Sequence, residues 1–324
     1  MTYAVSLPAG PIAGRDMIEL AQQCERWGYS EAWLAEVAGP DAFTVAGALA
    51  VSTTQRIGTA VVPIYNRTPM VLAMSAATVT QLSEGRFVLG LGTSSETIIS
   101  RWNGMPFDRP LTRMRETVGA VKEILSGAKT TFAGETLAVD GYRMTVPVDP
   151  PTPVYMAALN RRMLRLAGEI ADGVVLNMLA PQHVPLVKAE IAAGAHAAGR
   201  DPNDIELVAR IHIVHGLDRA TAGNVVRMVF GPYAAQTVYN RFFKWLGFVE
   251  EAEAIEAAWA SGDRAGVASG VSDELVSTMA VMGDTEECKA ALDAYLAAGV
   301  DVVALNPLTI DPDSVYNTLE LLRP

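Results

Sequence analysis

One short segment constrains the fold of this chain more than any other: PTPVYMAALNRRMLRLAGEIADGVVLN, residues 151–177. An apolar strand (Val154 to Ala158) is followed by a break at Leu159-Asn160, an amphipathic helix and a second strand that ends at Asn177. This order predicts a βαβ unit, because parallel strands need a crossover connection. The helix would begin beside the carboxyl end of the first strand, where its N–H groups can bind an anion.

Three basic residues, Arg161, Arg162 and Arg165, stand at the start of this predicted helix. Positive side chains there oppose the helix dipole unless an anion binds nearby. Two interpretations therefore stay open at this point: an anion-binding site, or a solvated basic face of the helix.

The same alternation of strands and helices runs through the whole chain. Further apolar strands are predicted at 3–7, 32–35, 57–62, 86–91, 205–214 and 302–305. Helical patterns separate them. Eight short, continuously apolar strands with helices between them predict an α/β fold, a parallel (β/α)8 TIM barrel. The 324 residues suffice for one such domain, 1–324.

Two regions exceed what a minimal barrel needs. Residues 129–147, around Asp140-Gly141, predict a β-hairpin or an irregular excursion. Residues 230–279 are mostly helical and fall between strands seven and eight. An insertion at that place would lie over the C-terminal mouth, where barrel enzymes have their active sites.

Composition excludes several other classes of protein. The net charge of −11 argues against a nucleic-acid or anionic-membrane surface. Cys24 and Cys288 lack metal-ligand spacing, which indicates free thiols in a reducing compartment and no metal site. Without a leader-like start or a run of about 18 apolar residues, the chain is expected to be soluble and cytoplasmic.

Five motifs occur together and in one order: CERWGYSEAWLAE, IGTAVVPIYNRTP, TQLSEGRFVLGLGTSSE, PVYMAALNRRMLRLAGEIADGVVLN and GDTEECKAAL. In this combination the chain resembles the bacterial luciferase-like monooxygenase superfamily, and within it the oxidoreductases that use the deazaflavin coenzyme F420. The resemblance implies a barrel with the cofactor in its C-terminal mouth, a small-molecule substrate and a homodimer.

The resemblance also implies where the cofactor binds. Ala60-Val61 falls at a strand-three bulge with a non-proline cis peptide, against which the ring packs, although ordinary barrel core is the alternative. Ala157, Ala158, Leu159 and Asn160 match the loop that holds the phosphate through backbone N–H groups, and Arg161 follows them. Gly92, Thr93, Ser94 and Ser95 offer backbone amides and hydroxyls at the same mouth, a second place for the cofactor tail or its phosphate. Asn177 is a further polar contact there.

At the residues that would transfer a proton, the chain departs from the family's pattern. The superfamily commonly has a carboxylate followed by histidine after the second strand, whereas this chain has Glu36-Val37. Either proton handling moves to Glu36, with Asp41 nearby, or this branch protonates by another route. A structural alternative is that Glu36 caps a turn or pairs with a basic residue. His212 is a further candidate, although a histidine in such a strand is more often a hydrogen-bonded core residue.

An aromatic stripe of the insertion, Tyr239, Phe242 and Phe243, has helical spacing and suits either core packing or the wall of a substrate pocket. The chain is thus expected to be an F420-dependent oxidoreductase that transfers a hydride to or from a small organic substrate. A monooxygenase using reduced FMN and a non-catalytic flavin-binding barrel are the alternatives.

Overall fold

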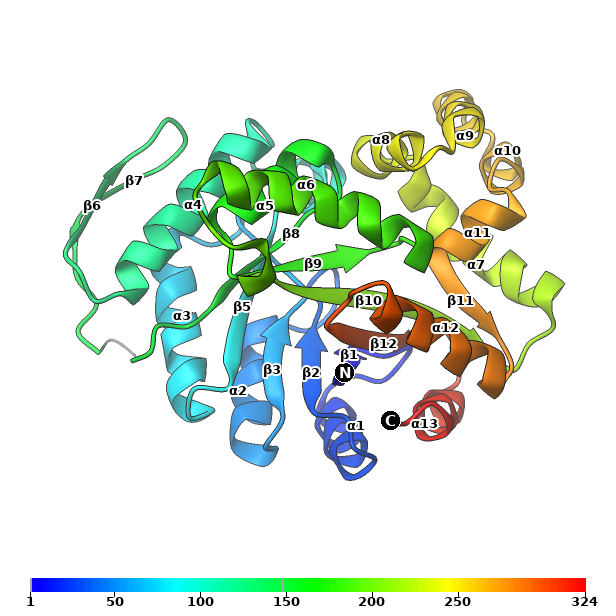
Figure 1. Ribbon diagram of the computed structural model, residues 1–324, viewed down its shortest axis with the longest axis horizontal. Helices are drawn as coiled ribbons and strands as arrows, with labels where there is room; N and C mark the ends of the chain where they lie inside the picture. The colour runs from blue at the N-terminus through cyan, green and yellow to red at the C-terminus, as the bar shows by residue number, and fades with distance from the viewer. Residues whose placement is uncertain (1, 147–148) are drawn as a thin grey trace.

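The structure is a computed structural model that describes residues 2–146 and 149–324. Its parallel strands close into a ring (Figure 1). In order around the ring they are β1 (Thr2–Leu7), β2 (Glu31–Leu34), β3 (Arg56–Thr59), β5 (Phe87–Gly92), β8 (Val154–Ala157), β9 (Gly173–Asn177), β10 (Glu206–His215) and β12 (Val302–Pro307). The ring closes because β10 pairs with both β9 and β12, and β12 pairs with β1. The prediction of a (β/α)8 barrel is confirmed.

Helices cover the outside of this ring. They are α1 (Arg15–Arg26), α2 (Ala42–Ser52), α3 (Pro69–Leu82), α4 (Pro110–Leu125), α5 (Arg161–Ile170), α6 (Val184–Ala197), α12 (Thr285–Ala297) and α13 (Pro312–Leu321). Several begin at a side chain that caps the first turn, among them Asp41 before α2 and the Asp284–Glu287 capping box of α12. Predicted and observed ends differ by a residue or two, as is usual at frayed termini.

The prediction of one continuous strand over 57–62 is wrong, because the structure divides this segment into two strands. β3 ends at Thr59, and a short β4 (Val62–Pro63) then pairs with β5. Between the pairs Gly58–Val88 and Val62–Leu91 the first strand carries one residue more than its partner. That extra residue makes a bulge at Ala60-Val61, which interrupts the ladder.

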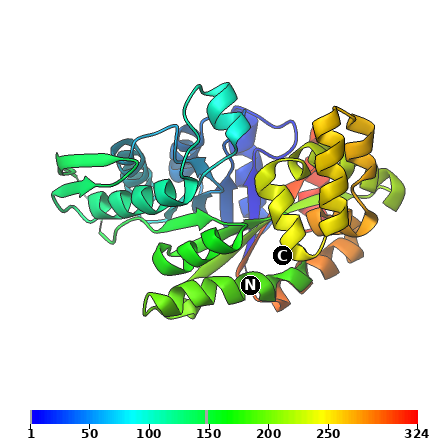
Figure 2. The ribbon, with the colours of Figure 1, turned by 90° about the horizontal axis from the view of Figure 1, so that it is seen from above.

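Both predicted insertions are present. Residues 129–147 contain an antiparallel hairpin of β6 (Thr130–Ala133) and β7 (Ala138–Tyr142), and the last residue of that range, Pro147, lies outside the described residues. The helical insertion begins earlier than predicted. It comprises α7 (Arg219–Ala234), α8 (Thr237–Leu246), α9 (Val249–Ser261), α10 (Arg264–Ser269) and α11 (Asp273–Met279). Figure 2 shows these helices, in yellow-green to orange, gathered at one end of the molecule.

A short strand, β11 (Ala280–Gly283), follows the insertion and was not predicted. It pairs with His212–His215 at the end of the long strand β10. Its four residues carry too little pattern to identify a strand, because its hydrogen bonds come from a neighbour that is distant in sequence. Among the described residues, no helix has the length and apolar character needed to cross a membrane.

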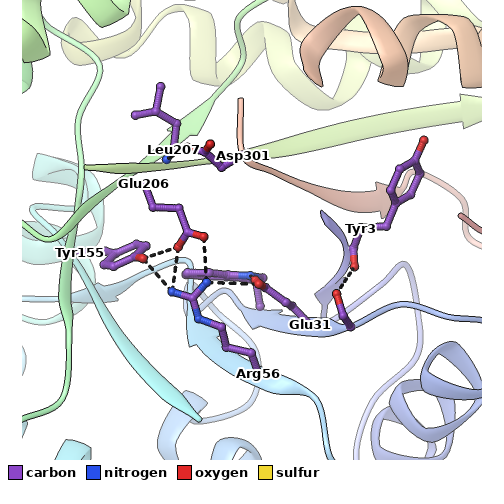
Figure 3. A network of polar contacts seen from close by, with 9 residues as sticks. Tyr3, Glu31, Arg56, Tyr155, Glu206, Leu207 and Asp301 are labelled. Carbon is purple, nitrogen blue, oxygen red and sulfur yellow. Dashed lines mark hydrogen bonds and ion pairs between the residues drawn. The ribbon is translucent and has the colours of Figure 1, made fainter. Parts of the chain in front are cut away.

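The barrel interior is filled in layers. An apolar layer contains Ala4, Trp33, Val88, Val175, Val208, Val302 and Ala304. Below it, at the first residues of their strands, Arg56 donates to Glu31 (3.2 Å) and to Glu206 (3.0 Å), and Tyr155 donates to Glu206 (Figure 3). This network closes the N-terminal end of the barrel, which leaves the C-terminal mouth for a site.

Candidate active site at the C-terminal mouth

Glycines form one wall of the mouth. A Cβ atom on Gly92 would lie 2.4 Å from a methyl carbon of Val61 and 3.6 Å from Cβ of Ala157, and one on Gly90 would lie 1.8 Å from the carbonyl oxygen of Thr59. β5 therefore packs directly against the bulge, which only glycine allows. The peptide bond between Ala60 and Val61 is cis, so that prediction is confirmed.

The loop from β8 to α5 presents an open helix N-terminus. Asn160 precedes the helix, and within the described part of the chain no side chain caps its first turn. The Asn160 side chain instead donates to the carbonyl oxygen of Val238 at 3.1 Å, in α8 of the insertion. Small Ala157 and Ala158 lead into this turn, so an anion can approach the unpaired N–H groups closely.

The basic residues of α5 differ in their partners, and a role in anion binding stays a prediction. Arg161 donates to Glu190 of α6 at 2.7 Å, and Arg165 donates to the other oxygen of the same carboxylate at 2.5 Å. Burial raises the pKa of Glu190, but the two arginines outweigh it and lower that pKa below its ordinary value. The charge of Arg161 is therefore largely compensated, whereas Arg162 is exposed beside it.

The loop after β5 carries Gly92, Thr93, Ser94 and Ser95, and Ser94 has a left-handed backbone (φ 60°). A π-helix, Thr97–Trp102, follows this loop. The hydroxyl of Thr97 donates to Gln236 at 3.3 Å, between α7 and α8. Two loops of the mouth thus touch the helical insertion, which supports the expected position of the insertion over the mouth.

Glu36 does not stand free at the end of β2. Both of its oxygens accept from Arg67, at 2.6 and 2.9 Å, and one also accepts from the backbone N–H of Ala42 at 3.0 Å. The same guanidinium contacts Asp41. The structure thus has the alternative arrangement, in which Glu36 pairs with a basic residue and binds the following turn, and its neighbours are all donors.

Asp41 has a structural task as well. It accepts from the N–H of Thr44 at 2.8 Å at the start of α2. Burial raises the pKa of Asp41, but hydrogen bonds from Thr44 and Arg67 outweigh it and lower that pKa below its usual range. Arg67 itself was missed from the sequence, where it stands in a loop with no visible partner.

His212 lies in the core rather than open to a substrate. Its Nε2 is 3.0 Å from the amide oxygen of Asn177, and the amide of Asn306 donates to its Nδ1 at 2.8 Å. Burial lowers the pKa of His212 well below its ordinary value, and the charge of Arg210 adds to the effect. Both ring nitrogens are satisfied, so His212 is a neutral, hydrogen-bonded residue.

The chain can be compared with known proteins now that this geometry is described. The sequence model of the family described as luciferase-like monooxygenase matches residues 2–302. A 5,10-methylenetetrahydromethanopterin reductase of Methanolobus tindarius is 29% identical over 314 residues, 95% of each chain. The reductase of the same name from Archaeoglobus fulgidus is 31% identical over 275 residues, which cover 82% of this chain and 80% of that one.

A solved structure shares the fold over the whole chain. The coenzyme F420-dependent tetrahydromethanopterin reductase of Methanopyrus kandleri superposes with a TM-score of 0.82 at 24% sequence identity, covering 99% of this chain and 96% of that one. The barrel and its insertions are therefore a known architecture.

Proposed function

The chain belongs to the luciferase-like monooxygenase family, and on this premise we propose that it is an oxidoreductase that uses coenzyme F420. It would transfer a hydride between this deazaflavin and a small organic substrate. The observation that carries the proposal is the uncapped first turn of α5, next to Ala157 and Ala158 and at the same mouth as the glycine wall of β5.

These residues fit the two ends of the cofactor. Val61, Gly92 and Ala157 provide a wall without protruding polar groups, against which a planar ring can lie. The N–H groups at the start of α5 provide donors for the phosphate of the tail. Thr93, Ser94 and Ser95 offer hydroxyl groups at the same mouth. When bound, the deazaflavin supplies the hydride chemistry, and the chain supplies binding and orientation.

Side-by-side titrations with F420 and FMN test the proposal, followed by quenching of tryptophan fluorescence. We expect F420 to bind at least about tenfold more tightly. Tighter binding of FMN would favour the reduced-FMN monooxygenase instead. A chain that binds neither cofactor would favour a non-catalytic barrel.

A pair of variants at Asn160 tests the phosphate position. Asn160→Asp places a negative charge at the start of α5 and should weaken F420 binding by roughly tenfold or more, since it repels the phosphate. Asn160→Ser is the matched control, because it also loses the hydrogen bond to Val238 but adds no charge. Equal affinities of the two variants would place the phosphate elsewhere.

A further inference from the structure

Arg210 is an interior cation at the mouth. It lies on β10 two residues above Val208, which belongs to the apolar interior layer, and its Nε donates to the hydroxyl of Ser6 at 2.8 Å. Ser6 is on β1, and β12 separates that strand from β10. The Arg210 side chain must therefore cross the inside of the barrel, above the apolar layer.

Arg56 and Arg67 are two other arginines of the barrel that differ from Arg210 in their partners. Arg56 contacts Glu31 and Glu206, and Arg67 contacts Glu36 and Asp41. Arg210 forms no ion pair within residues 2–146 and 149–324, and its one hydrogen bond there goes to a neutral hydroxyl. The two terminal nitrogens of its guanidinium are left for another partner. Arg210 is half-buried, and a cation partly removed from water without an anion is costly, so it is the kind of group that a ligand satisfies.

Within the described part of the chain, the titratable groups that interact with this guanidinium are the hydroxyls of Tyr233 and Tyr239 and the ring of His212. Burial raises the pKa of Tyr239 to about 12, with Tyr233 adding to the effect, so this phenol is neutral at pH 7. His212 is neutral too. Arg210 therefore places a positive charge inside the mouth of a protein whose net charge is −11.

An aromatic wall stands next to this charge. The ring of Phe230 lies 4.5 Å from that of His212 and 6.0 Å from that of Tyr233, and Tyr233 lies 5.9 Å from Tyr239. Phe230, Tyr233 and Tyr239 come from α7 and α8 of the insertion, and His212 from β10. A planar guanidinium suits a carboxylate, which it can bind through two parallel hydrogen bonds, and aromatic rings suit a flat apolar body.

We propose that Arg210 and the aromatic residues Phe230, Tyr233 and Tyr239 form a binding site for a planar organic acid, with the carboxylate on the guanidinium. That such an acid is also the substrate class rests on the proposed function. Tyr239 belongs to the aromatic stripe of the insertion, for which core packing and the wall of a substrate pocket were the two interpretations. In this proposal Tyr239 forms part of the pocket wall.

Benzoate and its neutral analogue benzamide are suitable probes, because they differ only in the charged group. Titration calorimetry on the parent chain should show benzoate binding at least about tenfold more tightly than benzamide, the preference expected of a charge-assisted pair. Equal binding of the two probes, or no binding of benzoate, would overturn the proposal.

Variants assign this preference to one residue. Arg210→Met should abolish it, and Arg210→Lys should keep only part, since an ammonium cannot form the two parallel bonds. Arg15→Met removes the same charge from the exposed surface of α1 and should leave the preference unchanged. An Arg210→Met variant with the parental preference would refute the assignment.

Chemical labelling of the parent chain covers the case in which a variant fails to fold. Phenylglyoxal modifies accessible guanidinium groups, and saturating benzoate, but not benzamide, should protect Arg210 in peptide mass spectra. Modification of Arg210 at the same rate with and without benzoate would contradict the proposal. F420 binding is measured separately: loss of F420 binding with benzoate preference intact would overturn the proposed function alone.

Discussion

Arg67 determines what Glu36 can do in this protein. Its guanidinium lies between Glu36 and Asp41, and the side chains of Arg67 and Glu36 are only 16% and 14% exposed. A general acid needs a proton to give, whereas each neighbour of the Glu36 carboxylate is itself a donor. Proton transfer by Glu36 stays a prediction, and the ion pair is what the structure contains.

A prediction at the residue scale follows from this pair. Glu36→Gln should lower the free energy of unfolding by about 1–3 kcal/mol, because Arg67 loses its main hydrogen-bonded partner. Asp41→Asn should cost less, since Asp41 is 46% exposed and asparagine also caps a helix well. Urea unfolding measures both. An unchanged midpoint for Glu36→Gln would show that the pair contributes nothing to stability.

In helix α5, two adjacent arginines have different surroundings. Arg161 and Arg162 are adjacent, but only Arg161 is held by Glu190. The helix periodicity places neighbouring residues on different faces, so each side chain meets a different environment.

This difference predicts unequal effects on F420 binding. At low salt, Arg162→Ala should weaken binding several-fold, roughly the effect of one exposed charge near a phosphate, and the loss should fade at high salt. Arg161→Ala should change affinity less, because Glu190 already compensates that charge. Titrations at two salt concentrations measure this, and a larger loss for Arg161→Ala would reverse the assignment.

At the scale of the whole molecule, a polar network closes the N-terminal end of the barrel. It joins the starts of β2, β3 and β10 through Glu31, Arg56 and Glu206. Burial raises the pKa of Glu206, but hydrogen bonds from Arg56 and Tyr155 outweigh it and lower that pKa below 4.5. Burial raises the pKa of Glu31 above its ordinary value. This second carboxylate therefore changes the stability of the folded chain with pH in the opposite direction.

The sign of the pH dependence follows from these directions. A carboxylate whose pKa is lowered by folding stabilises the folded chain above its unfolded pKa, and that contribution is lost as the pH falls through the folded pKa. Glu206→Gln should thus cost about 2 kcal/mol at pH 7, and the difference from the parent should shrink below pH 4.5.

Urea unfolding at several pH values checks this expectation. Glu135→Gln serves as the control, because Glu135 is 71% exposed and pairs with Arg109 at the surface. This control should differ from the parent by less than about 0.5 kcal/mol at each pH. A constant difference for Glu206→Gln down to pH 3 would show that Glu206 does not cause the pH dependence.

The barrel itself could be predicted from the sequence, because its signals are local. Apolar runs of strand length alternate with helical patterns, and capping residues such as Asp41 and Asp284 mark where helices start. The phosphate-loop candidate at 157–160 was likewise visible as a break between a strand and a helix. Local patterns indicated one strand at 57–62, and only the family resemblance predicted the bulge at Ala60-Val61. They also missed β11, whose pairing is set by β10.

The partners of the charged residues were decided only by the tertiary structure. Glu36 meets Arg67 across 31 positions, Arg161 meets Glu190 across 29, and Arg210 meets Ser6 across 204. The partner of a charged residue cannot be identified from the sequence when the two residues are far apart in the chain. Folding of the barrel brings such residues together at the strand ends. The sequence by itself determined the barrel and the end of it at which a site is expected, because periodicity and chain direction are local properties. The tertiary structure alone decided that Glu36 is paired and that Arg210 has no ion-pair partner among the described residues, because pairing depends on distances in space.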